Sequence, residues 1–171
     1  VGSHKGTYSD LFLKNFDIKK AFLFEPQEKI YVFLKKKYKN NIRVKILNKA
    51  ISNKNKIKTL RLNHHDLTTT LSKFNSNNLY LKLKSILFGV KEMTYNSVKI
   101  KTLKLDQFFS KNNIKIDLLK IDTEGHELEV LKGAEKNINK VKYILIEFHN
   151  DKIYQKYNPL KIHSFLLKKN F

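Results

Sequence analysis

Three carboxylates, a histidine and a glycine lie within six positions of the segment IDLLKIDTEGHELEVLKGA, residues 116–134. The segment begins with an apolar run and ends with helical periodicity, so it predicts a strand-to-helix turn at Asp122 to Glu127. Carboxylates at such a turn could orient a hydroxyl group, hold an ammonium group or accept a proton. A structural role is the alternative, because acids also stabilise the start of a helix and Asp122 or Thr123 could cap it. We expect Asp122 and Glu124 to contact a ligand, and Glu127 to interact with the helix dipole alone.

A second pair of polar side chains, Glu147 and His149, follows the apolar run YILI. Imidazole titrates at about pH 6.5, which suits a general base. We therefore predict His149 as the base for a hydroxyl acceptor, with Asp122 as the second choice. We expect His126 to face solvent.

Other histidines are poor candidates for a metal site. His64, His65 and Asp66 are consecutive, but neighbouring side chains of a strand point to opposite faces. We therefore expect no metal.

The first nine residues, VGSHKGTYS, contain two glycines, and the position of Glu25 relative to them resembles that of a ribose-binding acid. Glu25 lies 19 residues after Gly6 and ends the apolar run 21–24. Dinucleotide-binding folds place a ribose-binding acid roughly 20 residues after their glycine loop. A carboxylate can accept two hydroxyl hydrogen bonds, which suits Glu25 to the ribose. The alternative is that Glu25 is an exposed residue before Pro26 with no ligand. Gly2 and Gly6 would let the backbone approach a ligand closely.

The elements that position these residues alternate between strand and helix patterns. This alternation favours a single α/β domain over residues 1–171 with a parallel sheet, whose ligands bind at the carboxyl ends of the strands. The segment 63–93 is the least regular and is predicted to be an insertion or lid, with no role assigned to its hydroxyls at 68–72. The pattern predicts strands at 21–24, 43–51, 56–62, 98–105, 116–121 and 141–148, and helices at 7–16, 27–38, 107–111, after 127 and 160–169.

Composition limits the class of protein. The chain has 171 residues, no cysteine and no apolar run of membrane-spanning length, and no signal peptide is evident. We expect a cytoplasmic protein. The formal net charge is +20, but arginine occurs only at Arg43 and Arg61, and the lysines are spread along the chain. Nucleic acid is therefore disfavoured as a partner.

Three segments in this order resemble the FkbM-type S-adenosylmethionine-dependent methyltransferases. They are VGSHKGTYS at 1–9, FLFEP at 22–26, and LLKIDTEGHELEVLKGA at 118–134 followed by YILIEFH at 143–149. The resemblance implies a Rossmann-like, doubly wound, mostly parallel sheet, with S-adenosylmethionine as cofactor and a sugar or small-metabolite hydroxyl as acceptor. It implies cofactor binding by Gly2, Ser3, His4, Gly6, Glu25 and Asp122, and catalytic roles for His149, Asp122 and Glu124.

The chain also departs from the pattern of these methyltransferases. It begins after the point where their first strand ends in aspartate and stops before their terminal antiparallel hairpin, so we expect a fragment of that fold. Ser3 and His4 stand where alanine and asparagine are common in the family.

Three other functions remain open at this point. An RNA methyltransferase would explain the charge, and a non-catalytic module could retain the fold as a binding surface. A nicotinamide-dependent oxidoreductase is disfavoured, because Gly2-x-x-x-Gly6 is not the G-x-G-x-x-G loop that binds a pyrophosphate.

Overall fold

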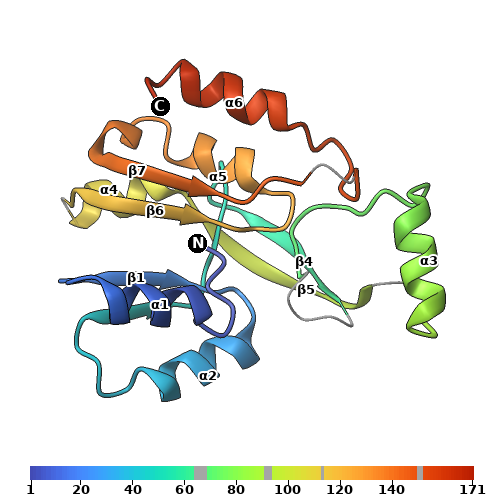
Figure 1. Cartoon of the computed structure of the whole chain (residues 1–171), viewed down its shortest axis with the longest axis horizontal. Helices are drawn as coiled ribbons and strands as arrows, with labels where there is room; N and C mark the ends of the chain where they lie inside the picture. Colours follow the sequence, from blue (N-terminus) through green and yellow to red (C-terminus); the bar gives the residue numbers. More distant parts are fainter. Residues whose placement is uncertain (64–68, 91–93, 113, 150–151) are drawn as a thin grey trace.

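The computed structural model describes residues 1–63, 69–90, 94–112, 114–149 and 152–171 (Figure 1). Within these residues helices and strands alternate, which confirms the predicted mixed α/β class. The elements in chain order are α1 (Thr7–Asn15), β1 (Ala21–Phe24), α2 (Glu28–Lys37), β2 (Val44–Leu47), β3 (Ala50–Ile51), β4 (Ile57–Asn63), α3 (Leu79–Leu87), β5 (Thr94–Leu103), α4 (Leu105–Asn112), β6 (Ile116–Ile121), α5 (Glu127–Gly133), a 3₁₀ turn (Ile138–Lys140), β7 (Val141–Ile146) and α6 (Pro159–Leu167).

The strands of the described residues form small sheets instead of the single continuous sheet that the sequence predicts. β1 pairs with β2 and β6 with β7, both in parallel, while β5 pairs in parallel with β3 and antiparallel with β4. The strand predicted at 43–51 is divided, because the chain turns between β2 and β3, where the Lys49 amide donates to the Leu47 carbonyl. The predicted parallel pairing of strands is therefore confirmed, whereas a single continuous sheet is not observed among the described residues.

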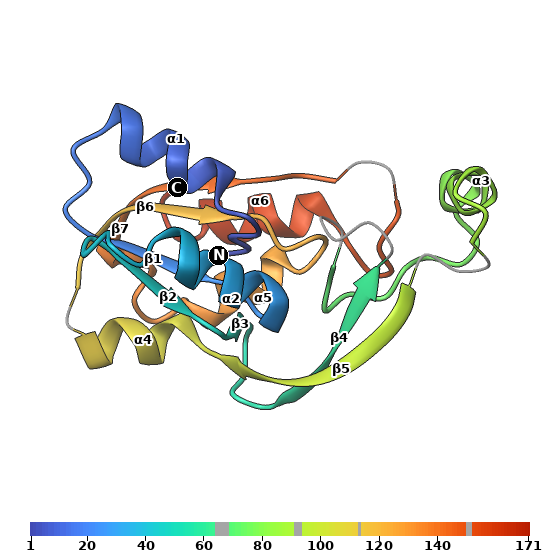
Figure 2. The ribbon, with the colours of Figure 1, turned by 90° about the horizontal axis from the view of Figure 1, so that it is seen from below.

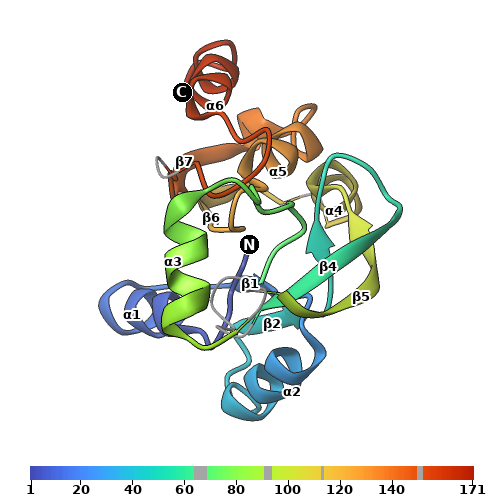
Figure 3. The ribbon, with the colours of Figure 1, turned by 90° about the vertical axis from the view of Figure 1, so that its right-hand side faces the viewer.

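The first residues of the chain connect the two parallel pairs at their carboxyl ends. The amides of Gly2 and Ser3 donate to the carbonyl of Phe24, the last residue of β1. The Val1 amino group donates to the Lys120 carbonyl at 2.8 Å, and the Asp122 amide donates to the Val1 carbonyl. Residues 1–3 thus lie between the ends of β1 and β6 (Figures 1 and 3). Loops that follow these two strands consequently meet in one region.

Helices cover both faces of β1 because its side chains alternate in direction. Leu23 packs in a buried cluster with Ile30 and Leu34 of α2. Phe24 points the other way, and its ring meets the edge of Phe108 from α4 with the centroids 5.1 Å apart. Burial on two faces explains the short, wholly apolar sequence of β1.

α5 packs in the largest hydrophobic cluster of the described residues. Val130, Leu131 and Ala134 are completely buried there, together with Ile121 of β6 and Ile162 of α6. The helix starts at the turn that carries the candidate site residues. Close packing of α5 therefore fixes the position of that turn.

Gly133, the last residue of α5, lies against the backbone that follows β3. A Cβ atom at this position would lie 2.3 Å from the Ser52 carbonyl oxygen. We expect Gly133→Ala to lower the free energy of unfolding by about 2 kcal/mol, because overpacking outweighs the gain of about 1 kcal/mol in helix propensity. Urea denaturation measures the change. The exposed neighbour Lys132→Ala is the control, expected to change stability by less than about 0.5 kcal/mol; unchanged stability of Gly133→Ala would refute this packing.

The described part of the segment 63–93 contains a helix that the sequence pattern did not predict. α3 begins after Asn78, whose side chain accepts a hydrogen bond from the Leu81 amide. The helix stands away from the sheets and the other helices (Figures 1 and 2). Among the helices of the described residues, none combines the length and the apolar character that a bilayer crossing requires.

Candidate active site

A cavity of about 250 Å³ lies where the loops after β1 and β6 meet. One wall is acidic, with Glu25, Asp122, Glu124 and Glu147. The lining also includes apolar residues, among them Ala50, Ile51, Leu60 and Leu71. The predicted site residues Gly2, His4, Glu25, Asp122 and Glu124 line this cavity, whereas Ser3, Gly6 and His149 do not. The expected convergence at the strand ends therefore brings most of the predicted site residues together.

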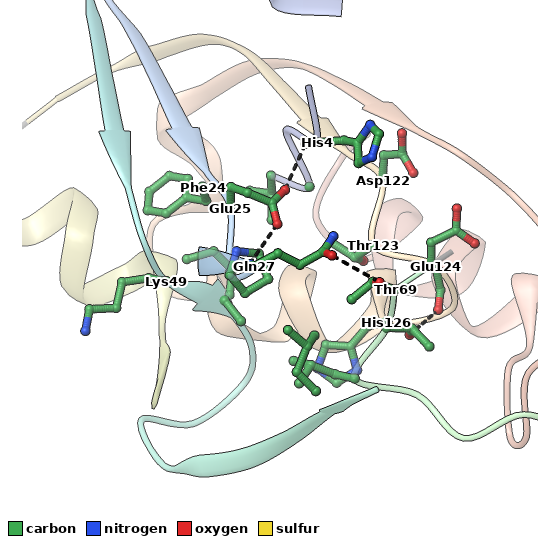
Figure 4. A pocket seen from close by; sticks show the side chains of 18 of the residues that line it. His4, Phe24, Glu25, Gln27, Lys49, Thr69, Asp122, Thr123, Glu124 and His126 are labelled. Carbon is green, nitrogen blue, oxygen red and sulfur yellow. Dashed lines mark hydrogen bonds between the residues drawn. The ribbon is translucent and has the colours of Figure 1, made fainter. Parts of the chain in front are cut away.

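Glu25 is the most strongly fixed acid of the cavity. Its side chain is 3% exposed, and its two oxygens accept hydrogen bonds from the His4 amide at 2.8 Å and the Gln27 amide at 2.9 Å (Figure 4). Each carboxylate oxygen has two lone pairs, so each can still accept a bond from a ligand hydroxyl. Burial raises the pKa of Glu25 to about 6, although both amide hydrogen bonds oppose this shift. The carboxylate is therefore mostly charged at neutral pH.

Asp122 follows β6 and is held by a lysine of the same strand. Lys120 Nζ lies 2.6 Å from the Asp122 carboxylate and 4.0 Å from the centre of the Tyr8 ring. On its other side Asp122 hydrogen-bonds Glu147, which follows β7. Burial, and then this contact with Asp122, raise the pKa of Glu147 above its ordinary value. Glu147 therefore retains its proton to a higher pH than an isolated carboxyl does.

Glu124 is fixed by residues far away in the sequence. Its backbone adopts a left-handed conformation with φ of 54°. The Tyr154 hydroxyl donates to the Glu124 carboxylate, and the Thr70 hydroxyl donates to the Glu124 carbonyl. Burial raises the pKa of Glu124, and the Tyr154 hydrogen bond opposes this shift. These contacts stabilise a backbone conformation that is costly for a residue with a side chain.

Glu127 closes the turn between β6 and α5. It is completely buried, and one carboxylate oxygen accepts bonds from the Thr123 amide, the Thr123 hydroxyl and the Gly125 amide. The prediction that Glu127 acts on the helix dipole alone was therefore too narrow. The alternative that Asp122 or Thr123 caps α5 was wrong, because His126 occupies the cap position and no side chain caps the helix.

The expectation that His126 faces solvent was also wrong. Its side chain is buried, with Nε2 3.0 Å from the Ser52 hydroxyl and 3.3 Å from Lys58 Nζ. Burial, together with the charge of Lys58, lowers the pKa of His126 to about 3. This histidine is neutral at physiological pH, and it lines the cavity.

The residues of the predicted glycine loop have different surroundings. At Gly2, with φ of 76°, a Cβ would lie 1.7 Å from the Asp122 carbonyl oxygen. The Ser3 hydroxyl donates to the Phe24 carbonyl. Gly6 lies against Tyr38 of α2, whose hydroxyl oxygen would be 2.6 Å from a Cβ. Gly2 thus permits contact between the cavity loops, whereas Gly6 permits packing on a helix.

His149 lies beside the cavity wall. Its ring makes edge contacts with the rings of Tyr154 and Tyr157, and its amide donates to the Tyr157 hydroxyl. His149 Nε2 is buried and has no hydrogen-bond partner among the described residues. Its role as a general base stays a prediction.

In the part of the chain that the structure describes, no group of three or more His, Asp or Glu side chains is placed to hold a metal ion. His64, His65 and Asp66, considered above, lie outside the described residues.

Comparison with known protein families decides the family of this chain. The family described as "Methyltransferase FkbM domain" matches residues 1–171. The chain belongs to the FkbM methyltransferase family. The resemblance seen in the sequence is therefore confirmed.

A curated relative has a more specific name. Hexuronic acid methyltransferase AglP of Haloferax volcanii is 38% identical over 60 residues, which cover 34% of this chain and 25% of that protein. The FkbM chain thus matches about a quarter of the length of this relative. No solved structure matches the sequence of the present chain.

Several residues at the FkbM site escaped prediction from sequence. Tyr154 lies 30 positions after Glu124 and carried no signal that would pair the two. Ser52 follows β3 and Lys58 lies in β4, and only the structure brings them to His126. The hydroxyl-rich stretch around Thr70 has no sequence pattern that predicts its contact with Glu124.

Proposed function

We propose that this FkbM family member transfers a methyl group from S-adenosylmethionine to an oxygen atom of a sugar or small metabolite. The observation that carries the proposal is the buried Glu25 carboxylate, which both backbone amides orient toward a cavity at the ends of β1 and β6. We further propose that the small sheets belong to a Rossmann-like arrangement. Helices on both faces of β1 and a cavity at the carboxyl ends of parallel strands support this.

The residues around the cavity fit the chemical groups of S-adenosylmethionine. When bound, the cofactor supplies an electrophilic methyl group on a positively charged sulfur. Glu25 has acceptor positions for the two ribose hydroxyls. Ala50, Ile51 and Leu60 provide an apolar surface suited to the adenine ring. The acidic residues Asp122 and Glu124 favour a ligand with positive charge.

The carboxyl pair of Asp122 and Glu147 is suited to bind the acceptor. Both residues line the cavity, and the elevated pKa of Glu147 makes its carboxylate a better proton acceptor than an isolated carboxylate. Lys120 holds Asp122 in place, and Tyr154 holds Glu124. We propose that the pair orients the acceptor hydroxyl and accepts its proton, while alignment of the reacting atoms supplies much of the rate. His149 is the alternative base.

The acceptor class is inferred from the curated relative. That relative is named for a hexuronic acid, so a sugar acceptor is favoured over RNA. The presence of Glu25 and Gly2 at the cavity argues against a non-catalytic module, since a buried carboxylate that binds no ligand only costs stability.

The pKa of Glu25 predicts how cofactor affinity depends on pH. Ribose hydroxyls donate to the charged carboxylate, so affinity is complete well above pH 6 and falls as the carboxylate is protonated near and below that pH. We expect the dissociation constant to rise about tenfold between pH 7.5 and pH 5. Fluorescence or calorimetric titration across this range measures it, and Glu25→Gln should flatten the profile. A wild-type affinity independent of pH would rule out this role for Glu25.

A methyl-transfer assay tests the proposal as a whole. The chain is incubated with S-adenosylmethionine labelled on the methyl group and with neutral sugars, uronic acids or RNA as acceptors. The wild-type chain should transfer label to a sugar, and the Asp122→Asn variant should lose this transfer. If only RNA accepts the label, the proposed sugar acceptor is wrong. If the chain binds the cofactor but transfers label to none of these acceptors, the non-catalytic module is favoured.

A further inference from the structure

α3 exposes more large apolar side chains than a short surface helix ordinarily does. None of its residues is buried, and Leu79, Leu83, Ile86 and Leu87 are 69%, 58%, 75% and 83% exposed. The helix stands apart from the rest of the fold in two perpendicular views (Figures 1 and 2). Contiguous exposed apolar surface on a protein marks an interaction site more often than chance exposure does.

The exposed side chains form one stripe with lysines on both edges. At about 100° per residue, Leu79, Leu83 and Ile86 project on the same side of the helix, with Leu87 beside them. Lys82 falls about 60° to one side of Leu79, and the positively charged Lys84 lies beyond Leu87 on the other side. An apolar face bordered by basic residues is the pattern of a helix that lies in the interface of a membrane.

The surroundings of α3 are basic as well. In the sequence from residue 67 to residue 105, Glu92 is the only acid. At the base of the helix the Asn75 amide donates to the Ile153 carbonyl, and the Gln155 amide donates to the Lys73 carbonyl. These bonds bring the segment that contains the exposed Lys73 alongside the segment that contains the exposed Lys152. The positive charge near the apolar stripe therefore comes from segments far apart in the chain.

We propose that α3 docks on a lipid surface that contains anionic lipids. The apolar stripe enters the boundary between headgroups and acyl chains, and the flanking lysines contact the anionic headgroups. A helix of nine residues is too short to cross the bilayer and instead lies along its surface. A second copy of the chain is a poorer occupant, because two such helices would bring Lys82 and Lys84 close to like charges without acids to pair with.

A short stretch of chain links α3 to the cavity. Thr70 and Leu71 line the cavity, and Asn78, the residue before α3, lies seven positions after Leu71. Phe74, between them, stacks on the ring of Tyr154, the residue that holds Glu124. Lipid docking does not depend on the proposed methyl transfer, so the two proposals fail independently.

Co-sedimentation with vesicles tests the docking. The chain is mixed with vesicles of phosphatidylcholine that contain about one third phosphatidylglycerol. We expect binding to these vesicles, with a partition coefficient about tenfold or more above that for pure phosphatidylcholine. The double variant Leu83→Glu, Ile86→Glu should lose about tenfold or more of this binding. Ile42→Glu is the matched control, because Ile42 is 99% exposed elsewhere on the molecule, and it should bind like the wild type.

Four results would overturn the proposal. The first is no binding of the wild type to the anionic vesicles, and the second is equal binding to neutral ones. The third is equal loss of binding in Ile42→Glu and the double variant, which would remove the role of α3. The fourth is a dimer, detected by light scattering, that the double variant abolishes in the absence of lipid binding; this would assign the stripe to a second copy. Circular dichroism of each variant confirms that the fold is retained.

Discussion

Replacement of Gly125 by alanine is expected to lower the free energy of unfolding by about 3 kcal/mol. We also expect it to lower the rate of methyl transfer about a hundredfold. Gly125 has φ of 84°, a conformation that costs about 1–2 kcal/mol for a residue with a Cβ. The added Cβ would also lie 2.3 Å from the Tyr154 ring. Because the Tyr154 hydroxyl donates to Glu124, displacement of the ring changes the acidic wall of the cavity.

Gly89 provides the matched control for this variant. It too has a positive φ, of 61°, but an added Cβ would meet nothing within 4 Å among the described residues. Gly89→Ala should therefore cost about 1 kcal/mol and leave methyl transfer unchanged. Thermal unfolding and an assay of initial rates measure both variants. Equal effects at the two positions would mean that contact with Tyr154 is unimportant.

Removal of the Glu25 carboxylate is expected to raise the dissociation constant for S-adenosylmethionine about a hundredfold or more. A hydrogen bond to a charged group contributes about 1.5–3 kcal/mol, and the ribose offers two hydroxyls to Glu25. Each factor of ten in affinity corresponds to about 1.4 kcal/mol. Glu25→Ala also leaves the amides of His4 and Gln27 without this acceptor, so retention of the fold is checked by circular dichroism.

Glu28→Ala separates a local effect from a general loss of negative charge. Glu28 is exposed in the first turn of α2, and its carboxylate accepts a bond from Asn48 outside the cavity. Equilibrium dialysis with labelled cofactor should give a wild-type affinity for this control. Similar affinities of Glu25→Ala and the wild type would exclude Glu25 as the ribose ligand.

Two short, largely apolar strands could be predicted well from the sequence. The apolar runs at 21–24 and 116–121 predict β1 and β6 with the bounds that the structure has. Burial imposes a clear pattern on such strands. α3 gave no comparable signal: its sequence LYLKLKSIL alternates at first like a strand, and its apolar residues face no core.

The candidate site was predictable in part, for a physical reason. Asp122, Glu124 and Glu25 follow strands, so their meeting follows from the rule for parallel sheets. The partners that fix them come from elsewhere in the fold: Tyr154 reaches Glu124 across 30 positions, and Lys58 reaches His126 across 68. Only the tertiary structure decides such pairings, which is why the environment of His126 was predicted wrongly.

Calorimetric titration of the wild-type chain with S-adenosylmethionine at pH 7.5 tests the central claim, that the cavity between β1 and β6 binds this cofactor. We predict binding to a single site with a dissociation constant in the micromolar range, and no heat of binding with a nicotinamide dinucleotide. Absence of binding by the folded chain would contradict the claim, and so would binding of the dinucleotide in place of S-adenosylmethionine.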